Sequence, residues 1–315
     1  MSDPQDVSIL PYSYVVGQKD LKCALALNFV APRIGGVLIS GQRGTAKSTA
    51  VRAFCLMAYD HLPTTLPINA TDDRVIGGWD LDSLMEGKLK RLPGLLEEAD
   101  KGLLYIDEVN LLDDHIVNII LDVASTGVLT VQREAIKEVR GVSFSLVGTM
   151  NPEEGGLRPQ LLDRFGLMIG VSELNPALRR AIVLRITHYD REVVEPGSRW
   201  IARGRRWDRR VQQQLRDAAK RFHNVELSSD VAQLCANVAA EFNAVGHHGE
   251  VVTALAAKAL AALDGSDKVE ARHIRKVAPM ALQHRRPEAA QGGPGEWSQE
   301  DHALLDAVVE RAEHR

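Results

Sequence analysis

The chain has 315 residues, a length that predicts about two domains. Hydrophobic residues make up 45% and charged residues 25%, which is typical of a globular protein and excludes a disordered chain. The formal net charge is −4, from 38 Lys and Arg against 42 Asp and Glu, so a dedicated nucleic-acid-binding protein is not expected. The N-terminus lacks the apolar core of a signal peptide, and no run approaches the ~20 apolar residues of a membrane span. We therefore expect a cytoplasmic protein without a membrane partner.

Short apolar runs alternate with helical stretches from residue 1 to about 185. Three brief runs bounded by turn residues predict strands that are buried on both faces of a parallel sheet. They span residues 36–40, 102–106 and 144–148. Helices are expected between them, at 47–59 and 115–125. This alternation predicts the α/β fold class, with helices layered on a sheet.

Arginine and tryptophan residues crowd together after this region. They are Arg199, Trp200, Arg203, Arg205, Arg206, Trp207, Arg209 and Arg210. Such a mixture could bind nucleic acid, but we favour a basic linker over 186–210 or a face that meets an acidic neighbour. Residues 211–285 have the pattern of helices only, and a Gly-rich break at 292–295 falls within a tail (286–315) that ends in a short helix.

The most informative stretch follows the first expected strand and opens a helix, which is the context of a nucleotide phosphate loop. It comprises Gly41, Gln42, Arg43, Gly44, Thr45, Ala46, Lys47, Ser48 and Thr49. Glycines let backbone N–H groups surround a phosphate, and the helix N-terminus adds favourable partial charge. We expect Lys47 to reach the β- and γ-phosphates of ATP and Ser48 to hold Mg²⁺.

One position departs from the general pattern GxxxxGK[ST], which has glycine where this chain has Ala46. A methyl group there is harmless if the backbone is right-handed. It costs on the order of 1 kcal/mol if the backbone is left-handed.

A second motif follows about 60 residues later, where an apolar strand ends in two carboxylates. Asp107 is placed to steady the Mg²⁺ shell, and Glu108 to orient and activate water. Because this pair follows a phosphate loop at a suitable distance, the sequence predicts that ATP and Mg²⁺ are its cofactors.

Four strings carry a family resemblance. They are Val-Gly-Gln at 16–18, Leu-Leu-Tyr-Ile-Asp-Glu-Val-Asn-Leu-Leu at 103–112, Gly-Thr-Met-Asn-Pro-Glu-Glu-Gly at 148–155 and Leu-Arg-Pro-Gln-Leu-Leu-Asp-Arg-Phe-Gly at 157–166. From residue 10 to about 285 the chain resembles the AAA+ ATPase I subunit of magnesium chelatase and its bacterial relatives in cobalt chelatases. The resemblance implies a P-loop αβα sandwich over 1–185, a C-terminal all-helical lid over 211–285, and assembly into a hexameric ring.

The resemblance also implies roles for single residues. Val16 and Gly17 are expected beside the nucleotide. Asn151 is similar to the sensor-1 residue, whose amide can bond the attacking water or the γ-phosphate. Arg164 is similar to the arginine finger donated into a neighbouring subunit's site, which is worth roughly a thousandfold or more in rate. Arg158 is a second candidate for the finger, and an Arg164 that only pairs with the preceding aspartate is the alternative.

Two inserts fit the same family. Residues 72–95 resemble its insertion within the second helix, and residues 131–140 resemble its hairpin before sensor 1. The alternation of apolar and charged residues over 131–140 independently predicts a two-stranded ribbon. In such rings these elements contact partners or line the pore.

The lid string departs from the family. Where relatives carry a sensor-2 arginine, this chain has Gly-His-His-Gly-Glu at 246–250, so His248 occupies the arginine's place. Histidine can donate to phosphate, but it is mostly uncharged at neutral pH unless an anion raises its pKa. Two alternatives stay open: neither histidine touches nucleotide, or the pair contributes to a metal site.

The predicted function is an ATP-hydrolysing, ring-forming motor of a magnesium- or cobalt-chelatase-type complex. It would drive metal insertion into a tetrapyrrole on a separate subunit, because Mg²⁺ gives up its waters reluctantly and insertion needs coupled work. The implied partners are a large chelatase subunit and a von Willebrand A-domain protein. Ala46 and a short segment after Tyr59 also resemble MoxR-type ATPases, so a remodelling ATPase acting on a von Willebrand A-domain partner is the alternative. A nucleotide-binding switch with little turnover is a third hypothesis.

Overall fold

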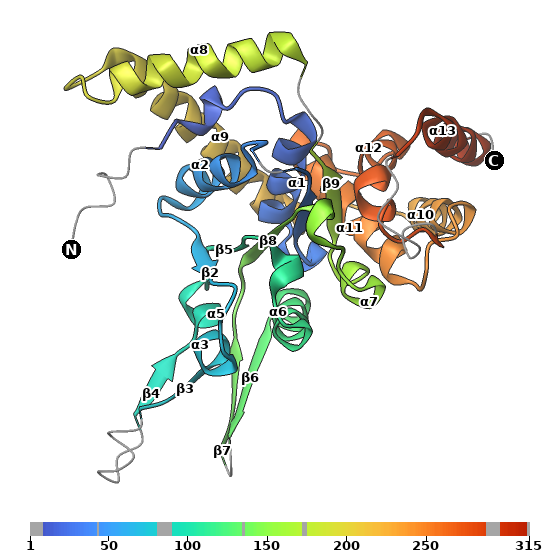
Figure 1. Cartoon of the computed structure of the whole chain (residues 1–315). Helices are drawn as coiled ribbons and strands as arrows, with labels where there is room; N and C mark the ends of the chain where they lie inside the picture. The colour runs from blue at the N-terminus through green and yellow to red at the C-terminus, as the bar shows by residue number, and fades with distance from the viewer. Residues whose placement is uncertain are drawn as a thin grey trace.

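The computed structural model describes residues 9–42, 44–80, 90–133, 136–171, 175–287 and 297–313. An α/β domain and a group of C-terminal helices lie side by side (Figure 1). Within the described ranges, no helix is both long enough and apolar enough to span a bilayer.

A five-stranded parallel sheet organises the α/β domain. Its strands are β1 (Val37–Ser40), β2 (Thr64–Leu66), β5 (Leu103–Ile106), β8 (Ser145–Met150) and β9 (Leu167–Gly170), in the order β2-β5-β8-β1-β9. The three predicted strands are confirmed, with bounds shifted by one or two residues. Because β8 lies between β1 and β5, the loops that follow these three strands emerge next to one another at one edge.

Helices cover both faces of this sheet. On one face lie α1 (Lys19–Val30) and α2 (Lys47–Tyr59); on the other lie α5 (Leu95–Glu98) and α6 (Asp114–Thr126). The two expected helices are confirmed, and α6 begins at an Asp113 cap that accepts from the backbone N–H of His115. Alternate residues of β5 face opposite layers, so Tyr105 points toward α2 and Leu104 toward α6.

Two antiparallel ribbons extend away from the sheet (Figure 1). The first follows α3 (Asp72–Ile76) and pairs β3 (Gly77–Trp79) with β4 (Arg91–Pro93). The second pairs β6 (Val128–Arg133) with β7 (Ile136–Gly141), which confirms the ribbon expected over 131–140. Arg91 joins the two ribbons, because its guanidinium pairs with Glu138 at 3.1 Å.

Most of the range 186–210, expected as a basic linker, lies in two helices joined by a turn at 193–198. It contains the end of α8 (Pro176–Glu192) and the first half of α9 (Arg199–Phe222). Asn175 and Ser198 cap these helices by accepting from backbone N–H groups, and arginine is a good helix former, so local preferences favour the helices. The N-terminal segment packs on α9: Tyr14 stacks on Trp200 with ring centroids 4.0 Å apart.

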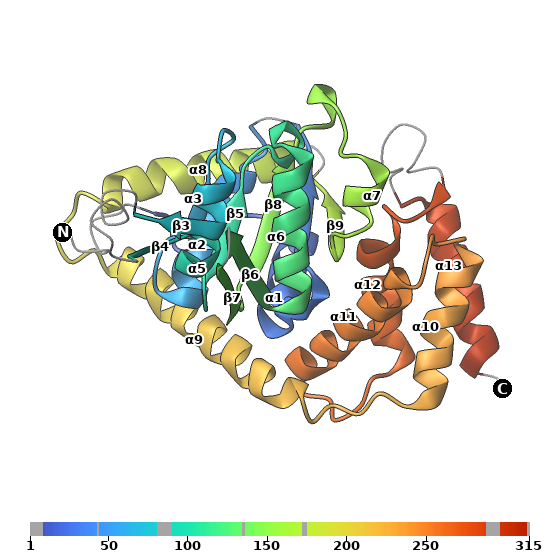
Figure 2. The ribbon, with the colours of Figure 1, turned by 90° about the horizontal axis from the view of Figure 1, so that it is seen from below.

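The remaining long helices form the C-terminal domain. They are α10 (Ser229–Glu241), α11 (His248–Asp264), α12 (Ala271–Leu282) and α13 (Gln299–Glu313). The expected tail helix is α13, which packs on α10 and α12 through a buried face that includes Leu305 and Val309. Helix α9 runs along the α/β domain and reaches this group at α11 (Figure 2).

Short helical turns complete the described chain. The 3₁₀ turns are η2 (Tyr12–Tyr14), η3 (Pro32–Ile34), η4 (Val109–Leu111) and η5 (Pro152–Glu154), and the short α-helix α7 spans Pro159–Leu162.

Candidate functional site

The phosphate loop joins β1 to α2 at the edge where the sheet loops meet. Gly41 is required there, because a Cβ would lie 2.6 Å from the carbonyl oxygen of Val171. The backbone of Ala46 is left-handed, with φ 61° and ψ 23°. Its methyl group therefore carries the strain of about 1 kcal/mol that we expected for a left-handed backbone at this position. Gly44 is also left-handed, at φ 79°, where glycine is unstrained. Arg43 lies outside the described residues.

Lys47 begins α2, and its side chain folds back over the phosphate loop. Its ammonium donates to the backbone carbonyls of Gly41 and Gln42. Burial lowers the pKa of Lys47, and the nearby carboxylates of Asp107 and Glu108 oppose that shift. The Lys47 ammonium and these two carboxylates therefore belong to one electrostatic site, as the sequence predicted.

A hydroxyl that we did not predict connects the two expected Mg²⁺ ligands. Tyr105, fully buried in β5, has its phenol oxygen 2.9 Å from Ser48 Oγ and 2.9 Å from Asp107 Oδ1. Thr149 donates to the same Oδ1 atom at 2.7 Å. Burial raises the pKa of Tyr105 to about 12, so its hydroxyl stays protonated and can donate. A signal was present in the sequence, because Tyr105 precedes Asp107 by two residues and must share its face of the strand.

Glu108 has an unusual backbone. Its φ is 55°, in the left-handed region that costs a non-glycine residue on the order of 1–3 kcal/mol. Its N–H donates to Thr149 Oγ1 at 3.1 Å, which helps to hold this conformation. Strain of this kind clusters at functional sites.

Asn151 follows β8 at the same edge and is buried. Its side-chain oxygen accepts from the backbone N–H of Glu153 at 3.3 Å, which fixes the orientation of its amide. Glu153 in turn accepts from Gln42 of the phosphate loop at 3.1 Å. The structure therefore brings the loop after β8 into direct contact with the phosphate loop.

A cavity of about 610 Å³ adjoins the phosphate loop, and its walls are mostly apolar. Val15, Val16 and Gln18 line it from the N-terminal segment, and Ala46, Thr49 and Ala50 from the start of α2. Helix α8 closes another side with Ile182, Arg185, Ile186 and Tyr189. Gln18 reaches from the cavity wall to the phosphate loop, donating to the Thr45 carbonyl at 3.4 Å, and Gly17 beside it has a left-handed φ of 70°.

Arg164 and His248 lie at a different place, where the lid meets the loop formed by residues 163–166. Arg164 does not pair with the preceding aspartate, as one alternative had it; its guanidinium bonds Asn118 and Asp122 of α6. The second finger candidate, Arg158, pairs with Asp114 at 2.6 Å.

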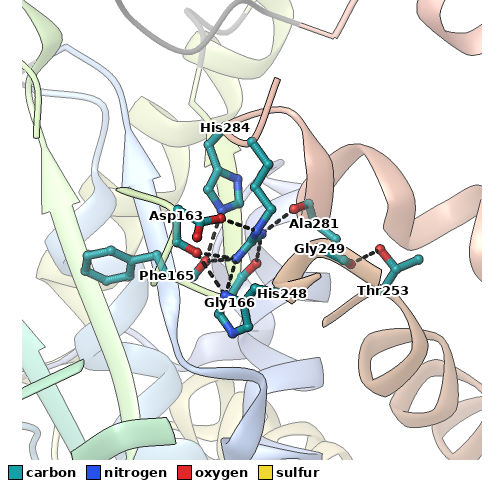
Figure 3. Close-up of polar contacts among 9 residues, drawn as sticks. Asp163, Phe165, Gly166, His248, Gly249, Thr253, Ala281 and His284 are labelled. Atoms are coloured by element: carbon teal, nitrogen blue, oxygen red, sulfur yellow. Dashed lines mark hydrogen bonds and ion pairs between the residues drawn. The ribbon is translucent and has the colours of Figure 1, made fainter. Parts of the chain in front are cut away.

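Arg285, from the lid, bonds the loop formed by residues 163–166; Figure 3 labels its partners Asp163, Phe165 and Gly166. Its side chain is completely buried and donates to the Asp163 carboxylate at 3.1 Å. It also donates to the backbone carbonyls of Asp163, Phe165 and Gly166 at 2.7, 2.6 and 2.9 Å. His284 adds a bond from Nε2 to the Phe165 carbonyl at 3.0 Å. We call Arg285, His284 and His248 the lid clamp.

His248 joins the lid clamp from the start of α11. Its Nδ1 lies 3.0 Å from the Asp163 carbonyl oxygen and 3.1 Å from Nη2 of Arg285. Burial lowers the pKa of His248, and the adjacent positive charge of Arg285 lowers it further. Both effects favour the neutral form of the ring. His247 is exposed, and the described residues contain no group of three His, Cys, Asp or Glu side chains that could hold a metal, so the two-histidine metal alternative gains no support.

Two family models match the chain: an AAA domain of the dynein-related subfamily over residues 36–165 and an AAA lid domain over residues 232–304. The α/β sandwich with a helical lid is thereby confirmed, and the lid match extends into α13. A crystal structure of a protein from Cytophaga hutchinsonii shares the fold, with a TM-score of 0.63 at 17% identity over 95% of this chain and 90% of that one.

Closer relatives share both sequence and length. The magnesium-chelatase subunit ChlI of Cyanophora paradoxa is 38% identical over 88% of this chain and 90% of its own, and the ChlI homolog of Methanocaldococcus jannaschii is 38% identical over 88% and 85%. A cryo-EM-based structure of the complex between subunits BchI and BchD of magnesium chelatase contains a chain that is 36% identical over 89% of this chain and 96% of that one, with a TM-score of 0.50. The chain belongs to the magnesium-chelatase ChlI/BchI subunit family of AAA ATPases.

Proposed function

We propose that this chain is the ATP-hydrolysing motor subunit of a magnesium- or cobalt-chelatase-type complex that inserts a metal into a tetrapyrrole held on a separate subunit. One observation carries the ATPase part: three groups of side chains meet at one edge of the sheet. Lys47 and Ser48 follow β1, Asp107 and Glu108 follow β5, and Asn151 follows β8. The family relationship supports the chelatase part.

The residues at this edge fit Mg²⁺. Ser48 and Asp107 offer the oxygen ligands that Mg²⁺ prefers, and both are hydrogen-bonded to the hydroxyl of Tyr105. Mg²⁺ bound there would neutralise charge that develops on the transferred phosphoryl group. Lys47 and the backbone N–H groups of the phosphate loop bind the phosphate oxygens.

Glu108 orients the attacking water and accepts its proton, and the Asn151 amide bonds the water or the γ-phosphate. The adenine base occupies the cavity beside Val16, whose apolar walls suit a flat heterocycle. His248 is held against the Asp163 carbonyl, and we assign it to the lid clamp in this state.

Arg164 acts in the active site of a neighbouring subunit, which requires a homo-oligomeric ring, a hexamer by family resemblance. Its guanidinium is 35% exposed, so a neighbour can reach it. The related BchI chain is in complex with BchD, another subunit of magnesium chelatase, which supports a second chelatase subunit as a partner of this chain. A large chelatase subunit and a von Willebrand A-domain protein complete the proposed set of partners.

Phosphate release and nucleotide binding test the ATPase assignments. Lys47→Ala should abolish nucleotide binding, whereas Glu108→Gln should bind ATP and not hydrolyse it. Arg164→Ala should bind nucleotide normally and lose hydrolysis by roughly a thousandfold. Arg158→Ala tests the second candidate for the finger, whose exposed side chain pairs with Asp114; it should retain activity, and a loss of hydrolysis there with activity kept in Arg164→Ala would reassign the finger to Arg158. Mixed rings of Arg164→Ala and Glu108→Gln subunits should recover activity; no recovery would contradict a finger that acts between subunits.

Metal insertion tests the chelatase assignment. The chain is combined with a large chelatase subunit, a D-type partner, porphyrin and Mg²⁺ or Co²⁺, and metalloporphyrin formation is followed by absorbance. ATP-dependent insertion that disappears with Glu108→Gln supports the proposal. ATP hydrolysis without insertion of either metal would favour the remodelling ATPase.

A further inference from the structure

The hydroxyl of Tyr105 occupies the point where the two proposed Mg²⁺ ligands meet. Its oxygen is 2.9 Å from Ser48 Oγ and 2.9 Å from Asp107 Oδ1. Ser48 lies in the first turn of α2 and Asp107 follows β5, and they are far apart in the sequence. The phenol therefore bridges two oxygen groups that only the fold brings together.

The position of this hydroxyl is itself fixed by packing. Tyr105 is 0% exposed and lies in β5, between β2 and β8 of the sheet. Its ring belongs to the apolar layer between the sheet and helices α1 and α2. A buried ring held by backbone pairing on both sides leaves its hydroxyl little room to move.

The proton directions follow from the chemistry of the groups. An ionised carboxylate only accepts, so Tyr105 donates to Asp107, and this charge-assisted bond is the stronger one. The same O–H is also directed at Ser48 Oγ, which accepts from it at 2.9 Å, so the phenol proton is shared between the two oxygens. A hydroxyl oxygen has two lone pairs, so Ser48 Oγ keeps one that is available for a cation.

The hydrogen bonds continue to Glu108. Thr149 donates to the same Asp107 oxygen at 2.7 Å and accepts from the backbone N–H of Glu108 at 3.1 Å. A continuous chain of bonds thus runs from Ser48 through Tyr105, Asp107 and Thr149 to the strained backbone of Glu108.

We propose that Tyr105 is a positioning residue for Mg²⁺: its hydroxyl holds Ser48 and Asp107 in the arrangement that binds the ion. The inference rests on the proposed function, because it assumes that Mg²⁺ and a nucleotide bind at this edge. Tyr105 acts only through the two ligands. Its loss should weaken the binding of the metal and leave metal-free nucleotide binding unchanged. Removing a group that orients metal ligands typically costs roughly 10–100-fold in metal affinity.

The test compares Tyr105→Phe with a matched control, Tyr59→Phe. Tyr59 is a second tyrosine whose hydroxyl bonds a serine, Ser145, at 2.6 Å. It ends α2, the helix whose first turn contains Ser48, about 16 Å away at 1.5 Å per residue. Both variants keep the ring and lose one hydroxyl, so a general loss of packing or stability would affect both.

The readout is binding of a fluorescent, hydrolysis-resistant ATP analogue, first in excess EDTA and then over a series of free Mg²⁺ concentrations. We expect the three proteins to bind equally well in EDTA. The free Mg²⁺ concentration that gives half of the Mg²⁺-dependent change in analogue binding should rise by about tenfold or more in Tyr105→Phe only. Electron paramagnetic resonance of Mn²⁺ in place of Mg²⁺ should show the same loss of bound metal.

Equal Mg²⁺ dependence in the two variants would overturn the inference. So would a Tyr105→Phe protein that binds the analogue more weakly in EDTA, because that result would place the defect in the nucleotide pocket rather than at the metal. Failure of the wild-type protein to bind the analogue would overturn the proposed function together with this inference.

Discussion

Arg285 is the residue at which the attachment of the lid to the α/β domain can be tested most directly. Its completely buried guanidinium donates to the Asp163 carboxylate and to backbone carbonyls of the 163–166 loop. Arg285→Met keeps a side chain of similar length and removes every donor. Breaking a buried pair in this way costs about 3–5 kcal/mol. Because Asp163 is 35% exposed and water can replace part of the loss, we expect the lower value, about 3 kcal/mol.

Differential scanning calorimetry of the nucleotide-free protein measures this effect. For a chain of this size about 1 kcal/mol corresponds to roughly 2 °C, so the midpoint should fall by about 6 °C. Arg272→Met is the matched control, because Arg272 lies in α12, is 57% exposed and pairs with Glu270 at the surface. Such pairs contribute about 0–1 kcal/mol, so this midpoint should move by no more than about 2 °C. Equal shifts in the two variants would refute the argument that the lid is held through Arg285.

Two further predictions concern pH and the phosphate loop. Burial lowers the pKa of His284 well below its usual value, so below about pH 6.5 the unfolded chain takes up a proton that the folded chain does not. The free energy of unfolding should then fall by about 1.4 kcal/mol for each pH unit of acidification. In urea unfolding at several pH values, His284→Gln should show a smaller dependence of the free energy of unfolding on pH. Ala46→Gly should raise the free energy of unfolding by about 1 kcal/mol, because it removes the strain of the left-handed backbone. Ala50→Gly, within the helix that follows, should lower it by a similar amount. A loss of stability in both variants would contradict the conclusion that Ala46 is strained.

The edge of the sheet that carries the site could be predicted from the sequence. The phosphate loop, Asp107 with Glu108, and Asn151 each follow a short apolar run, and buried parallel strands place their carboxyl ends together. Tyr105 was overlooked because its ring satisfies the apolar strand pattern by itself. A buried tyrosine hydroxyl also needs a polar partner, and that requirement is what identifies its second role.

The helical residues within 186–210, which belong to α8 and α9, were missed for a local reason. The density of arginine was interpreted as a solvated linker, although arginine favours helix and both Asn175 and Ser198 are good helix caps. The contact between Asp163 and Arg285 could not have been predicted from local patterns. The two residues are 122 positions apart, and only the packing of the lid against the sheet brings them together.

Arg164 combines a firmly held backbone with a weakly held side chain. The lid clamp binds the loop that carries it through the carbonyls on either side. Its guanidinium bonds Asn118 and Asp122 of α6, and the side chain of its charged partner Asp122 is 59% exposed. Exposed pairs of this kind contribute about 0–1 kcal/mol, so the side chain can leave Asp122 at small cost. An Arg164 paired with Asp163 inside the lid clamp would instead lose about 3–5 kcal/mol on release. By occupying Asp163, Arg285 therefore leaves Arg164 with an exposed partner that it can exchange while the position of its backbone stays fixed, as the proposed role as an arginine finger requires.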